Sequence, residues 1–228
     1  MHEALKATAA SPALERTYTF LRSEILSGRY PAGLRIKQEE IARTLGLSRI
    51  PVRDAIQRLL AEGFVTLQPD RGVVVTRLTA EDISELFEIR AALEALAVQL
   101  SAPRVEATFL ADSEEILNRM GRARGDISLW IKRHEEFHEQ LAAPCNRPRL
   151  AAQARHYRQM VEPYVRFYVT THHDPEMEGA EHRGLLETMK MQNPEFAREA
   201  MTAHVTTAAQ RVIDYIARAN PPGGGPER

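Results

Sequence analysis

Four of the eight histidines in this 228-residue chain lie on apolar helical stripes, where their ring nitrogens could bind a metal ion. His134 and His138 are four residues apart, so one helix would project both side by side. His182 and His204 fall on the inward stripes of two later helices. Each of them alone is better explained as a hydrogen-bonded core residue. The convergence of all four on one interior is better explained by a metal ion.

The chemistry of buried imidazoles supports this interpretation. A ring nitrogen without a partner is costly to bury, and several protonated rings in one interior would repel each other. A divalent cation satisfies both requirements. Nitrogen ligands suit zinc, nickel, cobalt or copper better than magnesium or calcium. We therefore predict one metal ion, preferably zinc with nickel, cobalt and manganese as alternatives, bound by His134, His138, His182 and His204.

The elements that would position these histidines form an all-helical segment over residues 79–219. Apolar residues recur at helical spacing in six segments, which are separated by Gly, Pro, Asp or Asn. This pattern predicts helices over about 79–100, 104–121, 127–142, 148–170, 176–191 and 195–219. No strand pattern interrupts them. The predicted fold class is mainly α, and this segment is predicted to be a bundle of six to seven helices.

Residues 13–78 carry a different pattern, in which three short helices precede a β-hairpin. Helices are predicted over about 14–27 and 38–45, and Ser48 is a good N-cap for a third. β-prone runs at 64–67 and 73–76 flank a turn, which predicts a hairpin. Three helices with a hairpin beside them are the layout of a winged helix-turn-helix.

The third helix of this module carries the predicted DNA-reading surface. Its apolar stripe leaves Arg49 and Arg53 on the opposite face, and Pro51 is harmless in its first turn. Arg71 lies at the tip of the predicted wing, where it could reach the minor groove or a phosphate. Bidentate hydrogen bonding of a guanine by Arg53 would contribute about 1–3 kcal/mol.

Charge and cysteine content fit a two-domain intracellular protein. Residues 11–77 hold 11 Lys+Arg against 7 Asp+Glu, a balance of +4, whereas residues 78–228 hold 18 against 23, a balance of −5. The single Cys145 cannot form an internal disulfide. The N-terminus lacks the apolar core typical of a signal peptide, and no apolar run approaches the roughly 18 residues needed to span a bilayer. A cytoplasmic location is predicted, with no membrane partner and with disordered segments at 1–12 and 220–228.

The N-terminal pattern resembles the winged helix of GntR-family transcriptional regulators. The resemblance rests on the run from Gly46 to Phe64, with Tyr-Pro-Ala-Gly upstream and Arg-Gly in the wing. It implies that Ser48 and Arg49 lie near phosphates and Arg53 near bases. It also implies DNA contacts from the remaining matched positions, Pro51, Arg71 and Gly72. Glu39 stands where FadR-type members can carry an arginine, so no contact is carried over there.

The helical segment resembles the FCD domain, the effector domain of the FadR-type subgroup. That domain has an Asp-x-x-x-His pair and then two histidines about 22 residues apart, and His182 and His204 have this spacing. The resemblance implies a small carboxylate effector at the metal, with Arg90 and Asn146 as effector-binding residues. An ion pair with Glu94, one turn along the helix, is the equally weighted alternative for Arg90.

The first histidine departs from the family pattern, because His134 occupies the aspartate position. A site with four neutral ligands would keep a net charge near +2, attract anions more strongly and lose metal more sharply as pH falls through about 6.5. The alternative is that His134 does not bind the metal and three ligands remain.

These features together predict a homodimeric, ligand-responsive transcriptional regulator, with repression the expected mode, that binds a pseudo-palindromic operator in double-stranded DNA. One rival is a metal-dependent hydrolase, because histidine-bound zinc can activate water. It would need Glu135 or Glu136 to turn inward as a base. Another rival is a regulator whose metal is purely structural or is itself the sensed signal.

Overall fold

The computed structural model describes residues 11–123, 125–172 and 175–219. The chain divides into two compact units, Met1–Arg77 and Leu78–Arg228, and each is considered by itself. Residues 1–10 and 220–228 of the segments predicted to be disordered lie outside the described residues. Pro12, which was also predicted to be disordered, begins the first helix. In the described part of the chain no helix is long and apolar enough to cross a membrane.

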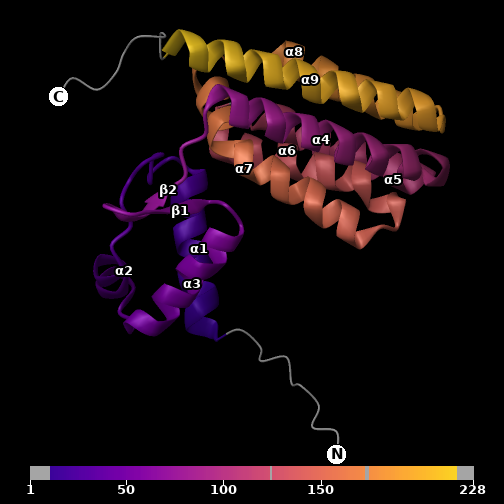
Figure 1. Ribbon diagram of the computed structural model, residues 1–228. Coiled ribbons are helices and arrows are strands. Elements are labelled where there is room, and N and C mark those ends of the chain that lie inside the picture. The colour runs from indigo at the N-terminus through magenta and orange to yellow at the C-terminus, as the bar shows by residue number, and fades with distance from the viewer. Residues whose placement is uncertain (1–10, 124, 173–174, 220–228) are drawn as a thin grey trace, which may run out of the picture. The chain divides into compact units, whose positions relative to one another are not determined.

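The described residues of the first unit, 11–77, form three helices and a two-stranded antiparallel sheet (Figure 1). In the sheet Val65 pairs with Val75 and Gln68 with Gly72. The first two helices and both strands begin and end within two residues of the bounds predicted from the sequence. The elements are α1 (Pro12–Leu26), α2 (Gln38–Leu45), α3 (Arg49–Ala61), β1 (Val65–Gln68) and β2 (Gly72–Val75).

Helical spacing of apolar residues explains how this unit packs. Leu21 of α1 and Ile56 and Leu59 of α3 are fully buried and belong to one core. Gly46 ends α2 in the left-handed conformation, with φ 65°, which a glycine adopts without strain. Ser48 precedes α3 as its N-cap residue, but its side chain makes no capping hydrogen bond.

The second unit contains six α-helices in its described residues, within the predicted range of six to seven. α4 lies alongside α9 and α7 (Figure 1). The helices are α4 (Ala80–Ser101), α5 (Ala107–Arg122), α6 (Ile127–Ala142), α7 (Pro148–His172), α8 (Pro175–Lys190) and α9 (Pro194–Ala219), with short 3-10 helices η1 (Ala102–Arg104) and η2 (Ala143–Cys145). Pro103 lies within η1, so the helix predicted to begin near 104 begins three residues later.

A reciprocal cap fixes the start of α4. The hydroxyl of Thr79 accepts a hydrogen bond from the backbone N–H of Asp82, whose carboxylate accepts one from the backbone N–H of Thr79. The core beneath it contains Phe87, Phe137 and Leu141. Buried among the apolar side chains of this unit are seven polar or charged ones, which need partners within the fold: Arg90, Glu94, Ser101, Ser113, His138, Arg158 and His182.

Candidate functional site

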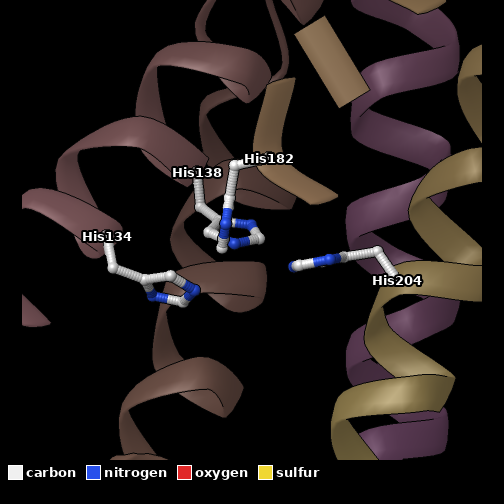
Figure 2. A group of neighbouring side chains, drawn as sticks. All are labelled: His134, His138, His182 and His204. Carbon is white, nitrogen blue, oxygen red and sulfur yellow. The ribbon is translucent and has the colours of Figure 1, made fainter. Parts of the chain in front are cut away.

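The four predicted histidines come together in the helical unit. One ring nitrogen from each lies within 4.8 Å of the corresponding nitrogens of the other three. His134 and His138 extend from α6, His182 from α8 and His204 from α9, and Figure 2 shows their rings gathered around a common space. The convergence expected from three separate apolar stripes is therefore present in the fold.

The donor set and its spacing fit a divalent metal ion. The ring centroids of His134 and His138 are 4.5 Å apart, and those of His182 and His204 are 4.9 Å apart. A tetrahedral ion with nitrogen bonds of about 2.0–2.1 Å would hold its ligand atoms about 3.4 Å apart. Small side-chain shifts would bring these nitrogens to that distance. Among the described residues, Nε2 of His138 and Nδ1 of His204 are buried and make no hydrogen bond, as expected of nitrogens that bind a metal ion.

The electrostatic environment favours the neutral form of His134, His138 and His204, which is the form that binds metal. Burial, followed by the neighbouring histidines, lowers the pKa of His134 and of His204 well below the usual value. Burial also lowers the pKa of His138, although the adjacent carboxylate of Glu94 opposes the shift. The cluster therefore presents lone pairs near neutral pH rather than positive charge.

Glu94 joins the histidine cluster to two buried arginines. Its Oε2 lies 2.8 Å from Nδ1 of His138 and accepts a hydrogen bond of 3.1 Å from Nη1 of Arg158. Its Oε1 accepts one of 2.9 Å from Nε of Arg90. From the sequence, Glu94 was expected only as a partner for Arg90, and Arg158 was not predicted as part of the site. No local pattern marks this contact, because Arg158 is on α7 and 64 residues from Glu94.

The two residues predicted to bind an effector are placed differently from the histidines. Arg90 is buried and forms an ion pair with Glu94, which was the alternative considered for it. Asn146 is exposed and ends η2 in the left-handed conformation, with φ 52°. A direct effector contact from either residue stays a prediction.

The carboxylates beside the cluster are held by arginines. Oε1 of Glu135 accepts a hydrogen bond of 2.8 Å from Nε of Arg158. Glu136 forms ion pairs with Arg119 at 3.2 Å and with Arg133 at 2.6 Å. A hydrolytic base would have to be a carboxylate free to take a proton from water. These pairings engage both oxygens of Glu136 and Oε1 of Glu135, whereas Oε2 of Glu135 is buried without a hydrogen bond.

In the first unit the predicted DNA-contacting residues are mainly exposed. Ser48, Arg49 and Arg53 are exposed at the start of α3, and Pro51 is half-buried beside them. Arg49 forms an ion pair of 2.9 Å with Glu39 of α2. Nη2 of Arg53 contacts the carboxylate of Asp54 at 3.2 Å. Such exposed pairs are weak and exchange readily for a phosphate or a base.

The wing carries the remaining predicted contacts. The guanidinium of Arg71 is exposed and donates a hydrogen bond of 3.2 Å to the carbonyl of Gly33. Gly72 begins β2 with φ 71°, and this conformation favours glycine at the turn. A surface groove lies between the start of α2 and this wing, and Arg35, Arg43 and Arg49 are among the residues that line it.

Both units match models of known protein families. The model described as "Bacterial regulatory proteins, gntR family" matches residues 13–75, and the FCD domain model matches residues 85–207, which is more than half of the chain. The chain belongs to the GntR family of bacterial regulatory proteins. Within that family it combines the helix-turn-helix domain with an FCD domain, as the sequence resemblance predicted.

Relatives in this family are named as transcriptional regulators. The chain is 30% identical over 191 residues to the HTH-type transcriptional regulator YdhC of Bacillus subtilis, covering 82% of this chain and 85% of YdhC. It is 29% identical over 190 residues to a protein of Paenarthrobacter nicotinovorans named as a probable D-xylose utilization operon transcriptional repressor, covering 82% of each. This GntR-family chain is thus a DNA-binding transcriptional regulator and not an enzyme.

Solved structures of GntR-family proteins share the fold. McbR/YncC of Escherichia coli superposes with a TM-score of 0.74 at 21% identity, covering 92% of this chain and 99% of McbR. A GntR transcriptional regulator from Rhodococcus sp. RHA1 gives a TM-score of 0.76 at 23% identity, covering 90% of this chain and 99% of the other. The mainly α fold class predicted from the sequence is confirmed.

Proposed function

We propose that this GntR-family regulator is a homodimeric repressor whose FCD domain binds one divalent metal ion and a small carboxylate effector. The observation that carries the proposal is the set of four histidine nitrogens within 4.8 Å of one another. Neutral nitrogen ligands from three helices favour zinc, with nickel, cobalt or manganese as alternatives. The ligands would be His134, His138, His182 and His204.

A carboxylate effector follows from the charge of this centre. Four neutral imidazoles leave the charge of a bound divalent ion uncompensated, and Glu94 is already paired with two arginines. A carboxylate would reduce that charge, and its oxygen could bind if the ion expanded beyond four ligands. When bound, the ion would supply Lewis acidity towards a carboxylate oxygen. The chain's own contribution is to hold the four donors and to keep them neutral.

The winged helix-turn-helix unit would read the operator. In a dimer, two copies of α3 would reach half-sites about one helical turn apart, which makes a pseudo-palindromic operator the expected target. Arg53 would contact bases, Ser48 and Arg49 would contact phosphates, and Arg71 would add a wing contact. Repression is proposed because proteins such as GlaR of Escherichia coli, which is 26% identical over 134 residues, are named repressors.

The alternative is a metal that is only structural or is itself the sensed signal. The two proposals differ in what changes DNA affinity. An effector-responsive repressor should change its affinity when a carboxylate is added at constant metal saturation. A metal sensor should change its affinity with metal alone, and a regulator with a structural metal should respond to neither.

A combined binding experiment tests the proposal. Purified protein would be analysed for metal content and then screened by thermal shift against small carboxylic acids, with and without a chelator. An operator selected from random duplexes would then report DNA affinity by fluorescence anisotropy. We expect one metal per chain and carboxylate stabilisation that the chelator abolishes. Protein without metal affinity, or with carboxylate stabilisation that survives the chelator, would contradict the proposal.

A further inference from the structure

Glu94 contacts one of the two ring nitrogens of His138. Both side chains are almost completely buried, and the contact between Glu94 Oε2 and His138 Nδ1 is 2.8 Å long. The other ring nitrogen of His138, Nε2, is buried without a hydrogen bond. The two nitrogens of this ring therefore have different surroundings, a carboxylate on one side and the other histidines on the opposite side.

Two arginines keep Glu94 ionised. Oε1 of Glu94 accepts a hydrogen bond of 2.9 Å from Nε of Arg90, and Oε2 accepts one of 3.1 Å from Nη1 of Arg158. Two guanidinium groups at this distance favour the charged carboxylate, and both of its oxygens act as acceptors. Arg158 is in turn held by Glu135 at 2.8 Å, so it cannot leave without separating a second ion pair. The arrangement forms a chain of contacts through three helices, from Glu135 on α6 to Arg158 on α7 and then to Glu94 on α4.

An ionised carboxylate can only accept hydrogen bonds, so Nδ1 of His138 must be the donor. A neutral imidazole carries one proton, and with that proton on Nδ1 the lone pair is on Nε2. Without Glu94 the proton could instead lie on Nε2, where it would block a metal ion. A carboxylate behind a histidine ligand also makes the ligand more basic and fixes its ring orientation.

We infer that Glu94 is a positioning residue that fixes His138 in the Nδ1–H tautomer and so presents Nε2 as a metal ligand. This inference rests on the proposed metal site and assigns a role that the four histidines cannot perform themselves. It also gives Arg90 and Arg158 a function, since each donates to Glu94 and holds its carboxylate in place.

The matched substitutions are Glu94→Gln and Glu135→Gln. With glutamine at position 94 the negative charge is lost, and the amide N–H2 must face either an arginine or Nδ1 of His138. In the first case Nδ1 keeps only a neutral carbonyl as its acceptor, and in the second case it has none, so the preference for the Nδ1–H tautomer weakens either way. Glu135→Gln disturbs the same Arg158 but leaves the contact between Glu94 and His138 intact. Both changes disrupt a buried ion pair, and only Glu94→Gln removes the charged acceptor for His138.

Nitrogen NMR of the His138 ring in chelator-treated protein would identify the tautomer. Titration with Co²⁺ would measure the metal affinity. We expect the Nδ1–H form in the wild type and in Glu135→Gln, and a smaller share of that form in Glu94→Gln. Affinity for Co²⁺ should fall about 10–100-fold in Glu94→Gln and much less in Glu135→Gln.

The wild-type measurement alone can overturn the inference, even if Glu94→Gln does not fold. A wild-type His138 with its proton on Nε2 would refute it, as would an equal loss of Co²⁺ affinity in both variants. Failure of the proposed function looks different. In that case the wild type would bind no Co²⁺ while its His138 still carried the Nδ1 proton.

Discussion

The indole ring of Trp130 lies stacked on the imidazole of His134, with ring centroids 5.1 Å apart and planes inclined by 20°. The two residues are four apart on α6, so their side chains project from the same face of the helix. Trp130 is the only tryptophan in the chain. Its fluorescence therefore reports directly on the histidine whose role as a ligand departs from the family pattern.

Titration of chelator-treated protein with Co²⁺ or Ni²⁺ should quench the fluorescence of Trp130, because an ion held by His134 would be within a few ångströms of the indole. The quenching should saturate at one ion per chain. In His134→Ala the same titration should produce a smaller change and a weaker apparent affinity. If His134→Ala titrates like the wild type, the centre has three histidine ligands rather than four.

Substitution of Arg53 tests the DNA-contacting surface. Arg53→Ala should lower affinity for the selected operator by about 1–3 kcal/mol while changing affinity for random DNA much less, because a base contact is lost. The control is Arg29→Ala, which removes an exposed arginine that pairs with Glu24. An unchanged ratio of operator to random affinity in Arg53→Ala would count against base reading by this residue.

Acid should destabilise the chelator-treated helical unit. Because the pKa values of His134 and His204 lie well below their usual value in the fold, the unfolded chain binds more protons than the folded one as pH falls below about 6.5. Stability from these groups is thus present above that pH and is lost below it. Unfolding by denaturant between pH 8 and pH 5 should show this decline, and His204→Asn should reduce it. A decline of the same size in His204→Asn would contradict the assignment.

The two helix N-caps should respond unequally to loss of their hydroxyls. Thr79→Ala removes the hydrogen bond to the N–H of Asp82 and should lower the free energy of unfolding by about 1 kcal/mol. Ser48→Ala should cost less, because the Ser48 side chain makes no capping hydrogen bond. It should instead weaken DNA binding at low salt. Equal destabilisation by the two substitutions, measured by denaturant unfolding, would show that this difference in capping is not present in solution.

The elements of the fold followed from local signals in the sequence. Gly46 ended α2, Thr79 with Asp82 began α4, and apolar spacing of the histidine-bearing stripes indicated which faces turn inward. Convergence of His134 and His182 could be predicted because both lie on such stripes, and their ring centroids are 5.1 Å apart.

What could not be predicted were contacts between side chains on separate helices. Arg158 and Glu94 are both charged, and a charge alone does not indicate a buried position. Their pairing depends on how α7 packs against α4, which periodicity along one helix does not specify. Likewise, Ser48 is a good capping residue by type, but the orientation of its hydroxyl depends on the local backbone.

The most direct test of the four-histidine centre is an anomalous diffraction measurement on crystals of the protein grown with zinc. The account predicts one strong anomalous peak per chain in the helical unit, about 2.0–2.1 Å from a ring nitrogen of each of His134, His138, His182 and His204. It also predicts that His138 binds through Nε2. Zinc held by other side chains, or no peak between α6, α8 and α9 at saturating zinc, would contradict it.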